Sequence, residues 1–263
     1  MVIRESVDIR IGRFGLTTGS GASIRRNDDV CPRLKLQANG SSKMFSVIFE
    51  VHPKPSEFEL YLALAKDLKS ILEGIDGFID NERFESKRRP GWILSHSSWR
   101  DEKSLVRWRT VAKHHETQQR GRDEVFQDYH LRVGQVVVDS TLPEGMKLLD
   151  QRLDETETGD AKFAALTEIS PAGGPVPENL ADILVLDRCR PALLNHDIFA
   201  SIYNEGKLTL LTSWRDRRSA EALDLGPLAS AGSVRHRIVR VVRDYGMFDR
   251  RESPQYYPEA TRA

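Results

Sequence analysis

The 263-residue chain has few cysteines, no long apolar run and no excess of charge. Its two cysteines, Cys31 and Cys189, are far apart and have no metal-ligand spacing, which predicts a reduced, cytoplasmic protein. No apolar segment approaches the roughly 20 residues that span a bilayer, so no membrane partner is expected. The 39 basic residues balance the 39 acidic ones, and we therefore expect no nucleic-acid partner.

Several enzyme signatures are also missing. There is no Gly-x-Gly-x-x-Gly after a strand and no Gly-x4-Gly-Lys-Ser/Thr, so a phosphate cradle is lacking. Gly-x-Ser-x-Gly is absent at a strand–helix turn, and no His-Glu-x-x-His pair marks a metal site. The basic stretch 235–243 alternates like a strand, which predicts a solvated sheet edge and not a nucleic-acid surface.

Residues 44–139 contain a readable order of strands and helices. Ser56 and Glu59 are expected to form a capping box, and Gly74 to end the helix that follows it. Asp101 is expected to cap a second helix. Alternating or β-prone runs predict four strands, over residues 44–52, 77–85, 92–98 and 125–138. The resulting β-α-β-β-α-β order is that of a ferredoxin-like unit.

Three short matches indicate that the second half repeats the first. The matches are Phe45-x4-Glu50 with Phe163-x4-Glu168, Ser98-Trp99 with Ser213-Trp214, and His130-x2-Val133 with His236-x2-Val239. The second copy is degenerate, because Leu223 replaces Trp108 and Gly226-Pro227 shorten its last helix. We therefore predict an α+β fold of two tandem ferredoxin-like units.

The expected organisation has five segments. They are a disordered N-terminal tail (1–43), the first unit (44–139), an acidic linker (140–160), the second unit (161–245) and a C-terminal tail (246–263). Because Met44 opens the first convincing strand, the alternative that translation starts at Met44 stays open.

One stretch in the first unit resembles a known family. The pattern S-x-W-x-D-x3-L-x2-W is formed by Ser97, Trp99, Asp101, Leu105 and Trp108, with His114 or His115 following. It is similar to the antibiotic biosynthesis monooxygenase family, a member of the dimeric α+β barrel superfamily, over roughly residues 44–139. That superfamily usually pairs two identical subunits. The resemblance thus implies an intramolecular dimeric α+β barrel here, present as a monomer or as a homodimer.

The resemblance implies a cofactor-independent monooxygenase that acts with dioxygen on an aromatic or quinol-like small molecule. An electron-rich substrate anion can itself reduce dioxygen, so the protein must bind, deprotonate and desolvate it. A histidine suits the proton transfer, and a tyrosine can steady an oxyanion. The candidate catalytic residues are His115, His114 and Tyr129, and the candidate substrate-binding residues are Trp99, Trp108, Glu50 and His52. His115 is preferred, because helical spacing places it on the Trp108 face.

Two alternatives stay open. A related branch of the superfamily binds and degrades heme through an asparagine on the first strand, a tryptophan on the second helix and a histidine ligand. Trp108 matches that tryptophan, whereas Glu50 holds the asparagine position. The other alternative is a non-catalytic barrel that holds a small ligand or serves a structural role.

Overall fold

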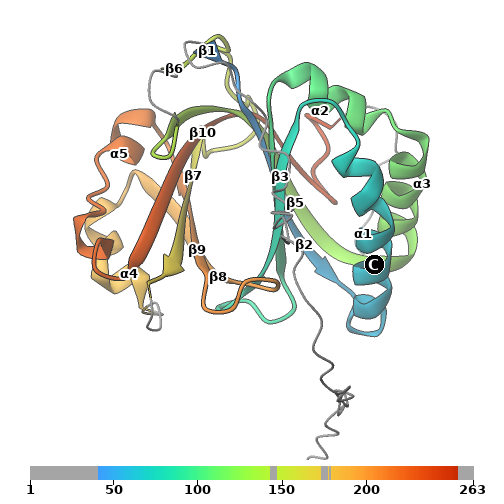
Figure 1. Ribbon diagram of the computed structural model, residues 1–263, viewed down its shortest axis with the longest axis horizontal. Coiled ribbons are helices and arrows are strands. Elements are labelled where there is room, and N and C mark those ends of the chain that lie inside the picture. Colours follow the sequence, from blue (N-terminus) through green and yellow to red (C-terminus); the bar gives the residue numbers. More distant parts are fainter. Residues whose placement is uncertain (1–40, 143–146, 173–176, 178, 254–263) are drawn as a thin grey trace, which may run out of the picture. The chain divides into compact units, whose positions relative to one another are not determined.

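The computed structural model describes residues 41–142, 147–172, 177 and 179–253, and eight of the strands in these ranges close into one barrel (Figure 1). The strands are β2 (Phe45–Pro53), β3 (Phe78–Ser86), β4 (Ile93–Trp99), β5 (Phe126–Asp139), β7 (Phe163–Pro171), β8 (Leu193–Ser201), β9 (Leu208–Trp214) and β10 (Gly232–Gly246). Their order around the barrel is β10-β5-β2-β4-β3-β8-β9-β7. The expected α+β class with a barrel-like sheet is therefore confirmed.

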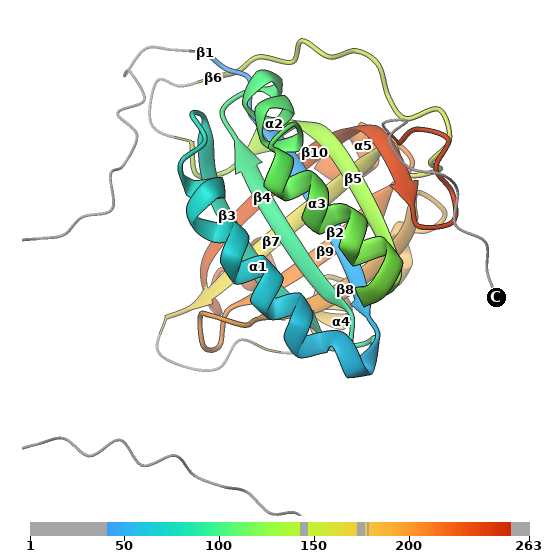
Figure 2. The ribbon, with the colours of Figure 1, turned by 90° about the vertical axis from the view of Figure 1, so that its right-hand side faces the viewer.

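Three helices cover the outer face of β2 to β5 (Figure 2): α1 (Phe58–Glu73), α2 (Glu102–Arg109) and α3 (Ala112–Arg120). In the described residues of the second half, the α-helices are two short ones, α4 (Leu180–Ile183) and α5 (Arg217–Glu221). Single turns occur at η1 (Pro55–Glu57), η2 (Gly121–Val125), η3 (Leu186–Cys189) and η4 (Gly226–Leu228). Within the described ranges, no helix combines the length and apolarity that a membrane crossing requires.

Two of the predictions made for the helices are confirmed, and two are wrong. Asp101 caps α2 by accepting a hydrogen bond from the Ser104 N–H at 2.8 Å, and Gly74 is the C-cap of α1. The capping box predicted at Ser56 is wrong, because Pro55–Glu57 forms a 3-10 turn and no side chain caps α1. The single helix predicted after Asp101 is broken between Arg109 and Ala112 into α2 and α3.

The two halves share one strand register. Phe45 pairs with Trp99 in the same way as Phe163 pairs with Trp214. The third sequence match, however, is displaced by one residue and is wrong. Opposite Glu50 lies His130, whereas Arg235 lies opposite the matching Glu168, so His236 is not the counterpart of His130. A shift of one residue moves a side chain to the other face of a strand.

With the register corrected, a mirrored pair of buried ion pairs appears inside the barrel. Arg132 binds Glu50 of its own half and donates to Ser213 Oγ of the other half at 2.8 Å. Its counterpart Arg237 binds the glutamate matching Glu50 and donates to Ser98 Oγ at 2.8 Å. Arg237 is only 1% exposed, so the predicted solvated edge is wrong: β10 lies between β5 and β7.

Two seams join the halves, and they differ in length. The register of β5 with β10 has nine residue pairs, whereas that of β3 with β8 has three, from Phe84–Ser201 to Ser86–Phe199. Side chains supplement the shorter seam. Arg89 Nε and Ser86 Oγ both donate to Asp197, at 2.7 and 2.9 Å, and Lys207 pairs with Glu82.

The segments expected to flank the two units are partly built into the fold. Ser41–Ser42 (β1) pairs in parallel with Lys147–Leu148 (β6), although residues 1–40 of the predicted tail lie outside the described residues. In the predicted acidic linker, Asp150 and Glu155 lie 3.0 and 3.1 Å from the Arg240 guanidinium. After β10 the chain turns back, and the Met247 N–H donates to the Tyr129 carbonyl at 3.1 Å.

Candidate active site

A cavity of about 630 Å³ lies between the helices and the outer face of the first-half strands. Val47 and Phe49 of β2, with Ser95 and Ser97 of β4, line it on the sheet side. Residues of α1, α2 and α3 line the helix side, and β10 contributes Val242, Arg243 and Tyr245. The cavity thus lies between the first-half sheet and the helices α1, α2 and α3.

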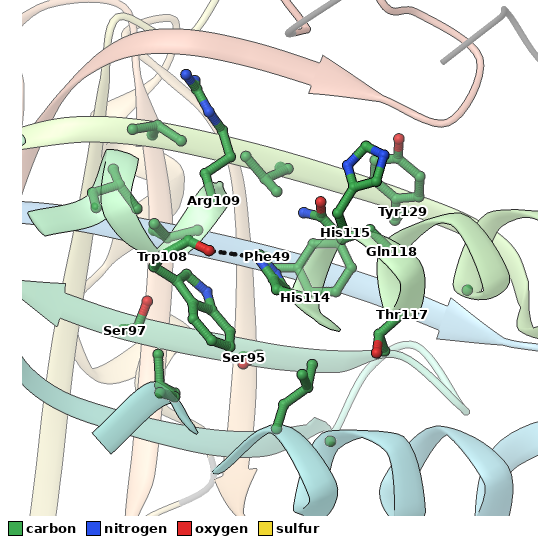
Figure 3. A pocket seen from close by; sticks show the side chains of 18 of the residues that line it. Phe49, Ser95, Ser97, Trp108, Arg109, His114, His115, Thr117, Gln118 and Tyr129 are labelled. Atoms are coloured by element: carbon green, nitrogen blue, oxygen red, sulfur yellow. Dashed lines mark hydrogen bonds between the residues drawn. The ribbon is translucent and has the colours of Figure 1, made fainter. Parts of the chain in front are cut away.

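Small side chains on β4 create this space. Ser95 and Ser97 face the cavity (Figure 3), whereas the shared register places Leu210 and Thr212 at the same positions of β9. Leu210 is fully buried in an apolar cluster that packs beneath α4 and α5. The second half therefore fills with side chains the volume that the first half leaves open.

Trp108 and His114 are held together in the cavity by ring stacking and a hydrogen bond. Their rings stack with centroids 4.0 Å apart and planes 18° apart, and His114 Nδ1 lies 3.1 Å from the Trp108 carbonyl oxygen (Figure 3). Because a carbonyl oxygen only accepts hydrogen bonds, Nδ1 must carry the proton. Nε2 then keeps its lone pair, and burial lowers the pKa of His114 to about 4, so the ring is neutral near pH 7.

The break between α2 and α3 changes which histidine meets Trp108. One continuous helix would place His115 on the Trp108 face. In the structure His114 stacks on the indole, and His115 lines the cavity from α3 (Figure 3). The histidine that stacks on Trp108 is thus His114, the other candidate, and both histidines belong to the cavity.

Tyr129 of β5 also lines the cavity, within an aromatic cluster that the sequence analysis missed. Its ring centroid lies 5.7 Å from that of Phe49 and 6.1 Å from that of Phe126, which is 6.2 Å from Tyr61. Phe49 could have been found from the sequence, because it is two residues from Val47 on β2 and therefore lies on the same face of the strand. The Tyr129 hydroxyl accepts a hydrogen bond from Arg250, and burial raises the pKa of this tyrosine.

Three predicted substrate-binding residues are not among the cavity-lining residues. Trp99 is fully buried, and its Nε1 donates to Ser97 Oγ at 3.0 Å. Burial alone would raise the pKa of Glu50 inside the barrel, but its arginine partners Arg132 and Arg89 outweigh this effect and lower the pKa. His52 stacks on Trp92 with centroids 5.3 Å apart. Among the predicted binding residues, Trp108 is the one that the structure brings to the cavity.

In the described part of the chain, no three histidine, cysteine or carboxylate side chains are grouped so as to hold a metal ion.

Comparisons with known proteins agree on one family. The antibiotic biosynthesis monooxygenase family model matches residues 44–120. A relative, the jasmonate monooxygenase ABM of Pyricularia oryzae, is 46% identical over 223 residues, which cover 83% of this chain and 100% of the relative.

Solved structures show a more distant likeness. An aldoxime dehydratase is 12% identical with a TM-score of 0.49, covering 78% of this chain and 80% of its own. A putative monooxygenase from Fusobacterium nucleatum is 11% identical with a TM-score of 0.36, covering 77% and 94%. The sequence relative is decisive, because its identity extends over most of both chains. The chain therefore belongs to the antibiotic biosynthesis monooxygenase family and is a monooxygenase.

Proposed function

We propose that this monooxygenase works without a bound cofactor and oxidises an aromatic or quinol-like small molecule in the first-half cavity. The observation that carries the proposal is His114, which is held in one tautomer against Trp108 with its Nε2 lone pair available. Phe49 and Tyr129 add aromatic surface against which a planar ring can pack. In the second half, Leu210 and Thr212 stand where the first half has Ser95 and Ser97. This contrast supports a functional role for the open cavity of the first half.

In the proposed reaction, His114 Nε2 accepts a proton from an acidic O–H or C–H of the substrate. The Trp108 carbonyl holds Nδ1–H and so orients the ring, as a third group does in other base assemblies. The substrate anion then reduces dioxygen. When an activated CH2 becomes C=O, the substrate supplies all four electrons and one oxygen atom leaves as water, so no external reductant is needed.

Because the relative is named a jasmonate monooxygenase, we include jasmonate among the candidate substrates. Hydroxylation of an unactivated C–H differs in its electron balance from the oxidation of an activated CH2 to C=O. It needs two electrons and two protons from outside, in addition to dioxygen. Adding or omitting a reductant such as ascorbate therefore separates the two reaction types.

The heme alternative receives less support. Glu50 holds the position at which the heme-degrading branch has asparagine, and it lies in the barrel interior, bound to Arg132 and Arg89. It is not among the residues that line the cavity, so the residues present do not fit that branch. We also propose that the two halves are ferredoxin-like units fused into one barrel, which the shared register of β2–β4 and β7–β9 supports.

The test measures oxygen uptake with a panel of quinols, polyphenols and jasmonate, with products identified by mass. His114→Gln is expected to lower turnover by about 100- to 10,000-fold, the range for loss of a general base. His236→Gln is the matched control, because its pKa is also lowered to about 4 by burial but it lies in the second half. If His114→Gln keeps wild-type uptake while His115→Gln loses it, the base is His115. A wild-type protein that oxidises its substrate only after heme is added would refute the cofactor-independent reaction.

A further inference from the structure

The cavity has more cationic than anionic side chains on its walls. The cations are Lys69, Arg83, Arg109, Arg122, Arg243 and Arg250, and the carboxylates among the described lining residues are Glu102 and Glu116. Both carboxylates have cationic neighbours, since Glu102 lies 2.6 Å from Arg152 and Glu116 lies 3.8 Å from Lys113. A mostly apolar cavity with this imbalance favours a ligand that carries negative charge.

The positive charge is concentrated around two buried phenols, Tyr129 and Tyr245. Burial raises the pKa of Tyr129, although Arg250 and Arg122 act in the opposite direction. Burial likewise raises the pKa of Tyr245 to about 12, against Arg250, Arg109 and Arg243. Both tyrosines are thus neutral near pH 7. Their hydroxyl groups can therefore donate hydrogen bonds to an anion.

Arg250 reaches this place from the far end of the chain. It follows β10 in the segment 247–253, is 8% exposed, and donates to the Tyr129 hydroxyl. Two residues later, Glu252 accepts four hydrogen bonds, from Thr156 Oγ1 at 2.8 Å and from the N–H groups of Glu157, Thr158 and Asp244 at 2.5, 3.0 and 2.6 Å. These bonds attach the segment to the linker and to β10, and so hold Arg250 at the cavity.

We propose that the cavity binds the carboxylate of an amphipathic acid, with the acid group held by Arg250 beside the Tyr129 hydroxyl. The hydrogen bonds that Glu252 accepts then hold the segment 247–253, and with it Arg250, at the cavity. A guanidinium matches the two oxygens of a carboxylate, and the apolar body of the acid packs against residues such as Phe49 and Leu131. This inference rests on the proposed function, because it takes the cavity to be the active site.

The test measures binding without turnover, so that its outcome does not depend on the reaction. Three acids and their neutral amides, benzoate, 1-naphthaleneacetate and 4-phenylbutyrate, are titrated calorimetrically into anaerobic wild-type protein and variants. At least one acid should bind tenfold or more tightly than its amide, and Arg250→Gln should remove this preference while leaving amide affinity unchanged. Glu252→Gln should lower the preference by a smaller factor, because an amide NH2 then faces two N–H or O–H donors.

Arg251→Gln is the matched control, because it removes the same charge one residue away from a side chain that is 64% exposed and paired with Asp249. It should keep the acid preference. Equal binding of acids and amides, no acid binding below millimolar concentration, or an equal loss in Arg251→Gln would each overturn the proposal. If acid binding is as expected but no panel compound is oxidised, the proposed function fails and this inference stands. If neutral quinols are oxidised without any acid preference, the reverse holds.

Discussion

Ser95→Leu would give the first-half cavity the residue that the second half has at the same position, Leu210. The exchange adds about three carbon groups, worth up to about 2 kcal/mol if fully buried at roughly 0.8 kcal/mol each. It also removes the Ser95 hydroxyl, which accepts from Asn81 Nδ2 at 3.2 Å, while Asn81 keeps its bond to the His96 carbonyl at 2.9 Å. We expect a net stabilisation of about 1 kcal/mol, or roughly 2–4 °C in Tm.

The same exchange should impair function, because the added side chain occupies the sheet side of the cavity. KM should rise with substrate size, by about tenfold or more for a two-ring substrate, while a one-ring substrate is affected less. The assay combines calorimetric Tm with oxygen uptake over substrates of increasing size. Leu210→Ser is the control. It should cost about 2–5 kcal/mol, because it opens a void in a closed core, and leave KM unchanged. Ser95→Leu with wild-type KM for every substrate would refute the assignment of this cavity as the active site.

Three further predictions concern charge and stacking. His114 is held neutral with its pKa lowered to about 4 from 6.5, so the unfolded chain binds a proton that the folded chain does not. The contribution of His114 to stability should therefore fall by up to about 3 kcal/mol as pH drops from 7 to 4. In urea titrations His114→Gln should remove this part of the pH dependence, whereas the part due to His236, whose pKa is also lowered to about 4, should stay. Trp108→Leu copies Leu223 and should lower turnover while changing Tm by only a few degrees. Arg132→Met leaves Glu50 buried without one cationic partner and should cost about 3–5 kcal/mol by chemical denaturation. Adding Glu50→Gln should recover part of that loss.

Local patterns in the sequence predicted much of the fold. Alternation in 44–52 predicted β2, and the spacing shared by Phe45 and Phe163 placed both at the start of equivalent strands. Asp101 marked the start of α2 because an N-cap depends on a few adjacent residues. The family pattern then singled out Trp108, His114 and His115, which line the cavity.

The site itself depended on features that sequence spacing does not determine. The break between Arg109 and Ala112 contains no proline or glycine, and it exchanged His115 for His114 beside Trp108. Arg250 could not be assigned, because its partner Tyr129 lies far away in the sequence and only the return of the chain after β10 brings them together.

The unequal seams of the barrel imply that it has a preferred line of opening. A closed ring of strands becomes one open sheet if any single seam separates, and the shorter seam, β3 with β8, has the fewest ladder pairs to lose. An ion pair adds to this seam, as Arg89 binds Asp197, and because the Asp197 side chain is only 5% exposed, salt screens this pair less than a surface pair. The opposite seam, on which Tyr129 and Tyr245 border the cavity, has nine ladder pairs and is expected to separate later.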